Sequence, residues 1–153
     1  MGSTARSATQ LDVLLVEDSE QDAELTQRVL KRHTPGSRIV WVRDGAEALV
    51  YLFGADARPD TPLAAEPRVV LLDIKMPRVD GHEVLRRVKT DARSRRIPVV
   101  VLSSSRVERD ISASLDVGAN SYVVKPVGYD EFSEAIRQVG AYWLGLNQPQ
   151  EGR

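Results

Sequence analysis

Short apolar runs alternate along the chain with longer segments in which apolar residues recur at helical spacing. The runs have the length and the Val, Leu and Ile content of β-strands, and they cover residues 13–16, 39–42, 69–72, 99–102 and 122–124. Three of them are almost continuously apolar, as is typical of strands in a parallel sheet covered on both faces. The run 39–42 contains a tryptophan and fits better at the edge of the sheet.

The segments between these runs predict five helices, at 19–32, 44–53, 81–90, 106–117 and 129–146. Ser19, followed by Asp22, has the spacing of a weak capping box at the start of the first helix. Gly118 is placed to end the fourth helix as a C′ glycine. The last helix repeats apolar side chains at helical spacing: Phe132, Ile136, Val139, Trp143 and Leu146.

Five strands alternating with five helices predict an α/β fold, a flavodoxin-like (βα)5 three-layer sandwich. Right-handed crossovers give a five-stranded parallel sheet, which we expect in the order 2-1-3-4-5. In such sheets ligands bind beyond the carboxyl ends of the central strands. Residues 11–146 form the expected domain, between flexible tails at 1–10 and 147–153, and the proline-rich segment 54–67 is expected to be a surface excursion.

Composition narrows the class of protein further. The 153 residues are 42% hydrophobic and 28% charged, with a formal net charge of −1 and no cysteine. These values are ordinary for a globular domain and exclude disulfides and thiolate metal sites. No apolar run approaches the roughly 20 residues that span a bilayer, and residues 1–10 do not form a signal peptide. We expect a cytoplasmic protein that binds neither membrane nor nucleic acid.

Charged and hydroxyl side chains stand where four of the predicted strands end. Glu17 and Asp18 follow the first strand, Asp73 the third, Ser103 the fourth and Lys125 the fifth. One acidic strand end would more often be a solvated cap. All five residues at neighbouring strand ends predict a shared site.

The charges at that edge require a cation. Two carboxylates about 4 Å apart repel by roughly 4 kcal/mol at an effective dielectric constant near 20. Lys125 supplies one positive charge, and a divalent ion with oxygen ligands would balance the remainder. Oxygen-only ligands favour Mg²⁺, or Mn²⁺, over zinc. Such a site suits phosphoryl transfer to Asp73, by positioning and charge compensation.

The chain resembles the response regulator receiver family over residues 11–146. The resemblance lies in LLVEDS at 14–19, VVLLDIKMPRVDG at 69–81, VVVLSSS at 99–105 and GANSYVVKP at 118–126. It implies that Asp73 accepts a phosphoryl group from a histidine kinase. It also implies a metal site formed by Asp18, which binds the ion directly, by Asp73, by Glu17 through water and by the backbone carbonyl of Lys75.

The resemblance assigns roles to residues after the fourth and fifth strands as well. Ser103 would form a hydrogen bond to one phosphoryl oxygen, and Lys125 would form an ion pair with another phosphoryl oxygen. Tyr122 matches a switch aromatic that turns inward, although a packed core tyrosine is an equal alternative. Pro126 follows a peptide bond that is cis in the family, against about 5–6% of X-Pro bonds generally.

The loop after the acceptor has both familiar and unusual features. Pro77 and Gly81 fit the turn that brings this loop to the metal. Lys75 places a cationic side chain two residues after the acceptor and could alter autodephosphorylation. An aspartyl-phosphate phosphatase would need an acid at that position, which speaks against this class. A flavodoxin-like FMN carrier is disfavoured because Glu17 and Asp18 would repel its phosphate.

The C-terminal residues suggest partners. The end YWLGLNQP and the segment before the third strand resemble small regulators associated with phytochrome-type histidine kinases. This implies a bacteriophytochrome partner and a homodimer with contacts from Tyr142, Trp143 and Leu146, with core packing of Trp143 as the alternative. A phosphorelay intermediate for another kinase remains open. The basic residues at 86–96 fit a solvated face better than a nucleic-acid patch.

Overall fold

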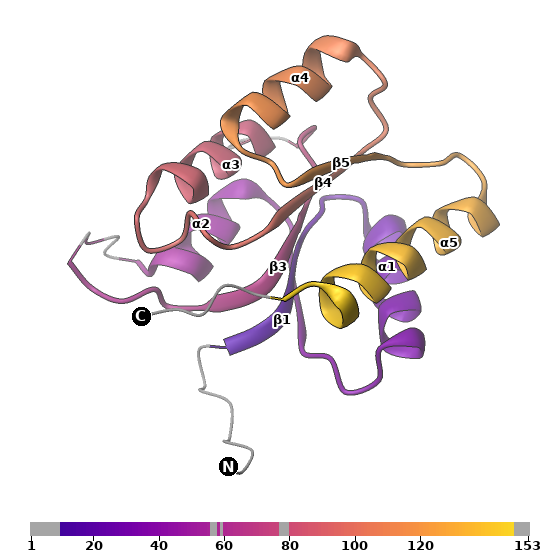
Figure 1. The fold of residues 1–153 in the computed structure, drawn as a ribbon, viewed down its shortest axis with the longest axis horizontal. Coiled ribbons are helices and arrows are strands. Elements are labelled where there is room, and N and C mark those ends of the chain that lie inside the picture. Colours follow the sequence, from indigo (N-terminus) through magenta and orange to yellow (C-terminus); the bar gives the residue numbers. More distant parts are fainter. Residues whose placement is uncertain (1–9, 56–57, 59, 77–79, 149–153) are drawn as a thin grey trace.

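The computed structural model describes residues 10–55, 58, 60–76 and 80–148. Five parallel strands form one sheet in the order β2-β1-β3-β4-β5, and Figure 1 shows the sheet at the centre of the fold. The strands are β1 (Gln10–Val16), β2 (Ile39–Val42), β3 (Glu66–Leu72), β4 (Val99–Ser103) and β5 (Ser121–Val124). The order predicted from the sequence is confirmed.

Helices cover both faces of the sheet, which gives three layers. They are α1 (Glu20–His33), α2 (Gly45–Phe53), α3 (Gly81–Thr90), α4 (Glu108–Val117) and α5 (Tyr129–Gly140). Helices α1 and α5 lie side by side on one face, and α2, α3 and α4 lie on the other (Figure 1). No helix in the described part of the chain is long and apolar enough to cross a bilayer.

The alternation of side chains along β1 produces two cores. Leu14 and Val16 belong to the first core, beneath α2 and α3, whereas Val13 and Leu15 belong to the second core, beneath α1 and α5. All four are essentially inaccessible to solvent. Because successive strand residues point to opposite faces, only a strand that is apolar throughout can be covered on both sides. The prediction that the continuous apolar runs are strands covered on both faces is therefore confirmed.

Side-chain caps fix where several helices begin. Ser19, Asp44 and Asp80 each accept a hydrogen bond from the backbone N–H three residues later, at the starts of α1, α2 and α3. Such caps satisfy N–H groups that have no partner within the helix. Gly118 ends α4 with a φ of 126°, as expected for a glycine in this position.

Helix α4 is the least embedded of the five. Ser114 is its only buried residue in the structure, and Leu115 is 45% exposed. The preceding residue Val107 caps α4 without a side-chain hydrogen bond. Few apolar contacts hold this helix in place, and such elements are the ones that move most easily.

The C-terminal helix differs from the prediction. Helix α5 ends at Gly140 and continues as a π-helical segment, Ala141–Leu146, in which the Asn147 N–H donates to the Tyr142 carbonyl. The wider turn changes which side chains face the sheet. Trp143 packs against the second core, whereas Leu146, which the helical repeat placed on the apolar face, is 74% exposed.

The excursion before β3 is anchored to the domain. Leu63 and Ala65 are buried in the first core, and the Ala64 N–H donates to the Leu52 carbonyl. The Arg93 guanidinium donates to the carbonyls of Arg58 and Thr61. The segment is therefore packed at its C-terminal half. The predicted tails lie mostly outside the described residues, as does Pro77, and β1 already begins at Gln10.

Candidate functional site

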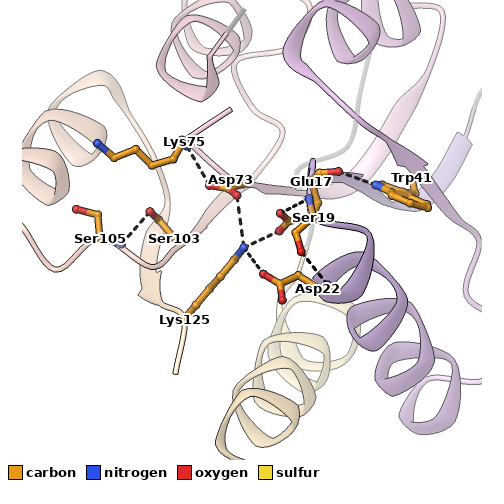
Figure 2. A network of polar contacts seen from close by, with 9 residues as sticks. All are labelled: Glu17, Ser19, Asp22, Trp41, Asp73, Lys75, Ser103, Ser105 and Lys125. Carbon is orange, nitrogen blue, oxygen red and sulfur yellow. Dashed lines mark hydrogen bonds and ion pairs between the residues drawn. The ribbon is translucent and has the colours of Figure 1, made fainter. Parts of the chain in front are cut away.

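The carboxyl ends of four neighbouring strands bring the predicted site residues together. Glu17 and Asp18 directly follow β1, Asp73 follows β3, Ser103 ends β4 and Lys125 directly follows β5. Since the strands are parallel, these ends share one edge of the sheet. Figure 2 shows the side chains of four of these residues converging there.

Lys125 is the centre of the site. Its Nζ lies 2.8 Å from Glu17 Oε1, 2.8 Å from Asp22 Oδ2 and 3.4 Å from Asp73 Oδ2 (Figure 2). The Lys125 side chain is only 9% exposed. Burial lowers the pKa of Lys125, but the charges of Glu17 and Asp73 and the hydrogen bonds to Glu17 and Asp22 raise it more, so the ammonium stays charged.

Asp22 is the partner of Lys125 that the sequence reasoning missed. The sequence pattern indicates it only as one half of a capping box with Ser19. The Ser19 hydroxyl does accept a hydrogen bond from the Asp22 N–H at 3.2 Å. The Asp22 carboxylate, however, points to Lys125 (Figure 2). The signal available was its position on the first turn of α1, directly after the acidic pair that follows β1.

Glu17 is held on three sides. Its Oε1 accepts from Lys125, its Oε2 accepts from the Ser19 N–H at 3.1 Å, and its backbone carbonyl accepts from Trp41 Nε1 at 2.7 Å. Its side chain is 3% exposed. Burial raises the pKa of Glu17 to about 7, and Lys125 opposes this rise while the Asp73 charge adds to it. This carboxyl group therefore needs more positive charge nearby to stay ionised at neutral pH.

The acidic residues can supply that need by holding a divalent ion. One carboxylate oxygen from each of Glu17, Asp18 and Asp73 lies within 4.8 Å of the others. Two oxygens on opposite sides of a Mg²⁺ ion with bonds of about 2.1 Å lie about 4.2 Å apart. Small side-chain movements would close the set around an ion, and an all-oxygen donor set is the one that Mg²⁺ and Mn²⁺ prefer.

The loop after β3 packs tightly around Asp73. The Lys75 N–H donates to Asp73 Oδ1 at 2.9 Å, and Asp73 is 7% exposed. Gly81, at the start of α3, has no side chain because none fits: a Cβ there would lie 2.5 Å from the Asp73 backbone oxygen. The predicted turn glycine is thus a point of close approach.

A second network joins the other side of the site to α4. The Ser103 hydroxyl accepts from the Ser105 N–H at 3.1 Å, and the Ser105 hydroxyl donates to Asp110 Oδ2 at 2.6 Å. Lys75 Nζ lies 3.2 Å from the same Asp110 oxygen. The Tyr122 hydroxyl donates to the Ser105 carbonyl at 3.0 Å, and its half-buried ring packs against the first core. The roles of Ser105 and Asp110 were not predicted.

One prediction about the site is wrong. The structure contains no cis peptide bond among the described residues, so Lys125–Pro126 is trans. The trans form of an X-Pro bond is favoured by about 0.5–1 kcal/mol, and cis bonds are its minority form. Lys125 reaches the three carboxylates from a trans bond.

The sequence matches a known protein family over most of its length. The family model of the response regulator receiver domain covers residues 13–137. The chain belongs to the response regulator receiver family.

This receiver is similar in sequence to several single relatives. It is 40% identical over 136 residues to the probable methanogenesis regulatory protein FilR2 of Methanothrix harundinacea, covering 89% of this chain and 85% of that one. It is 36% identical over 132 residues to the response regulator Rcp1 of Synechocystis, covering 86% of this chain and 88% of that one.

Two related crystal structures superimpose well on this receiver. The phosphorylated cyanobacterial phytochrome response regulator RcpA covers 93% of this chain and 99% of its own at a TM-score of 0.83 and 34% identity. The Mn²⁺-bound form of Rcp1 covers 92% of this chain and 99% of its own, at a TM-score of 0.81 and 33% identity.

Several of the basic residues of the receiver at 86–96 have partners within the chain. Arg86 pairs with Glu83, and Arg93 pairs with Asp91. Lys89 Nζ donates to two backbone carbonyls and to Asn120 Oδ1.

Proposed function

We propose that this receiver accepts a phosphoryl group on Asp73 from the phosphohistidine of a histidine kinase, with Mg²⁺ bound beside it. The observation that carries the proposal is the position of Asp73, buried at the edge of the sheet. There it lies 3.4 Å from Lys125 and within reach of an ion held with Glu17 and Asp18. A carboxylate, an ammonium and a cation site are the groups that an in-line phosphoryl transfer needs.

The transfer makes one bond and breaks another. An Asp73 carboxylate oxygen attacks the phosphorus, the P–N bond to the kinase imidazole breaks, and an acyl phosphate remains on Asp73. A bound Mg²⁺ would neutralise charge on the transferred group. Lys125 supplies the positive charge that the protein itself brings to the same oxygens. Asp18, Asp73 and Glu17, with the backbone carbonyl of Lys75, are the proposed protein ligands, and Mn²⁺ would fit the same donors.

The phosphoryl group would then change the surface around α4. The Ser103 hydroxyl accepts from the Ser105 N–H and can donate its own O–H to a phosphoryl oxygen. A shift of Ser103 toward that oxygen would draw the loop after β4 toward Asp73. Tyr122 and Asp110 are bonded to Ser105, so its movement reaches the Tyr122 ring and the first turn of α4. The loosely embedded α4 is the element most easily displaced.

The kinase is proposed from the relatives. RcpA is named as a phytochrome response regulator, which supports a light-sensing kinase as the donor. FilR2, by contrast, is named for methanogenesis, and its similarity supports a phosphorelay with a non-phytochrome kinase as the second candidate. We also propose a homodimer, to which the exposed Tyr142 and Leu146 would contribute. Trp143 packs mainly within its own chain and would contribute less.

Phosphotransfer tests the proposal. A purified bacteriophytochrome histidine kinase, labelled on its histidine, is mixed with the wild-type receiver, with Asp73→Asn and with Asp44→Asn. Asp44→Asn is the matched control, because asparagine can keep the cap at the start of α2. We expect transfer to the wild type and the control, loss of transfer with EDTA, and no transfer to Asp73→Asn. Undiminished labelling of Asp73→Asn would contradict the assignment. Transfer from an unrelated histidine kinase but not from a bacteriophytochrome would support the second candidate.

A further inference from the structure

All the donor capacity of Lys125 is already in use. An ammonium group has three N–H donors, and three carboxylates lie around it, from Glu17, Asp22 and Asp73. The two shorter contacts, at 2.8 Å, are to Glu17 and Asp22, and the contact to Asp73 is 3.4 Å. A phosphoryl oxygen on Asp73 can take over the long contact that Lys125 makes to this residue. It can gain a second hydrogen bond from Lys125 only if Glu17 or Asp22 releases a donor.

Asp22 is the partner that can release Lys125 most easily. The Glu17 side chain is 3% exposed and is also bound by the Ser19 N–H, so moving it would leave buried polar groups unpaired. The Asp22 side chain is 32% exposed and can be solvated as soon as it turns away. Asp22 also stands on the first turn of α1, where its backbone N–H is fixed by Ser19 whatever its side chain does.

We propose that Asp22 is a positioning residue that holds Lys125 in the unphosphorylated receiver and competes with the phosphoryl group for it. The inference rests on the proposed function, because it assumes that Lys125 binds the phosphoryl oxygens. Asp22 raises the free energy of the phosphorylated state in two ways. It occupies a donor that the phosphoryl group needs, and it adds a negative charge beside an incoming dianion.

The competition has a signature that a purely structural residue would not give. Removing the Asp22 charge favours an anion at Asp73, so binding of a phosphoryl mimic becomes tighter. The same removal takes negative charge away from the cation site, so Mg²⁺ binding becomes weaker. A residue that merely supported the fold would weaken both ligands together.

Beryllofluoride, which binds aspartate carboxylates as a phosphoryl mimic, is the probe. Its affinity is measured by calorimetry at saturating Mg²⁺, and Mg²⁺ affinity is measured separately. The proteins are the wild type, Asp22→Asn, Asp22→Ala and the control Glu24→Gln, which removes one charge from an exposed position of the same helix. We expect beryllofluoride to bind about three- to tenfold more tightly to Asp22→Asn, and at least as tightly to Asp22→Ala. Mg²⁺ should bind about two- to threefold more weakly to both, and Glu24→Gln should match the wild type.

The possible failures are distinguishable. If the wild type shows no Mg²⁺-dependent beryllofluoride binding, the proposed function fails and the inference fails with it. If the wild type binds, but both folded Asp22 variants bind beryllofluoride no more tightly than the wild type, the inference alone is wrong. Equal tightening by Glu24→Gln would also overturn it, because the effect would then come from net charge.

Discussion

The indole Nε1 of Trp41 donates a hydrogen bond of 2.7 Å to the backbone carbonyl of Glu17. This bond ties the edge strand β2 to the segment that carries the acidic residues, as Figure 2 shows. The Trp41 ring is half-buried, and the guanidinium carbon of Arg43 lies over it, 4.3 Å from the ring centroid. Trp41 is therefore placed both to fix the backbone of Glu17 and to sense changes there.

We expect Mg²⁺ binding to change the fluorescence of Trp41. A metal ion bound to the Glu17 carboxylate would shift the Glu17 backbone carbonyl, to which the indole is hydrogen-bonded. Titration of the Trp143→Phe variant, in which Trp41 is the only tryptophan, should retain the Mg²⁺-dependent change. Trp41→Phe, which loses one hydrogen bond worth about 1 kcal/mol, should bind Mg²⁺ up to about fivefold more weakly by calorimetry. An unchanged affinity would show that this bond does not position Glu17.

The raised pKa of Glu17 predicts how pH affects the metal-free protein and its Mg²⁺ affinity. The folded protein holds the Glu17 proton up to about pH 7, whereas the unfolded chain releases it near its ordinary value of 4.5. Glu17 therefore contributes stability at low pH that is lost as pH rises from about 4.5 to 7. Mg²⁺ must displace that proton, so its affinity should rise over the same range.

Thermal unfolding with and without Mg²⁺ at pH 5.5 and pH 8 measures both effects. We expect a larger Mg²⁺-induced rise in Tm at pH 8. In Glu17→Gln, most of this pH dependence should disappear. An equal Mg²⁺ effect at both pH values in the wild type would contradict the raised pKa.

Gly81→Ala should damage the acceptor loop. Its added Cβ would lie 2.5 Å from the Asp73 backbone oxygen, so either α3 or the loop must shift. Such overpacking costs about 1–3 kcal/mol, and urea denaturation should show this loss together with weaker Mg²⁺ binding. Gly145→Ala is the matched control, because a Cβ there meets nothing within 4 Å. Equal stabilities of the two variants would show that the close approach is relieved at no cost.

The ion pair between Lys75 and Asp110 should restrain α4 in the unphosphorylated receiver. It joins the acceptor loop to the first turn of the helix, and Ser105 reinforces it by donating to the same carboxylate. Both partners lower the pKa of Asp110, so it is ionised throughout the physiological range. Amide hydrogen exchange in Glu108–Val117 should become several-fold faster in Asp110→Asn but not in Glu108→Gln, a change at an exposed neighbour. Unchanged exchange in Asp110→Asn would show that the pair does not restrain the helix.

The sequence predicted the parts of this molecule that follow from periodicity and strand topology. Asp73 and Lys125 could be assigned to one site because the ends of parallel strands meet at one edge. Asp22 and Asp110 could not be assigned in this way, because a side chain on the first turn of a helix can reach the site or solvent. The choice depends on packing. The trans bond before Pro126 and the π-helical segment after Gly140 depend on small energy differences that residue spacing does not reveal.

Direct mapping of the modified residue tests whether Asp73 becomes an acyl phosphate in a metal-dependent reaction. The receiver is phosphorylated by a histidine kinase with and without Mg²⁺, reduced with borohydride, and analysed by tandem mass spectrometry. Reduction converts an aspartyl phosphate to homoserine. We expect homoserine at position 73 only when the divalent ion is present. Homoserine at another aspartate, or the same yield at position 73 in excess EDTA, would contradict it.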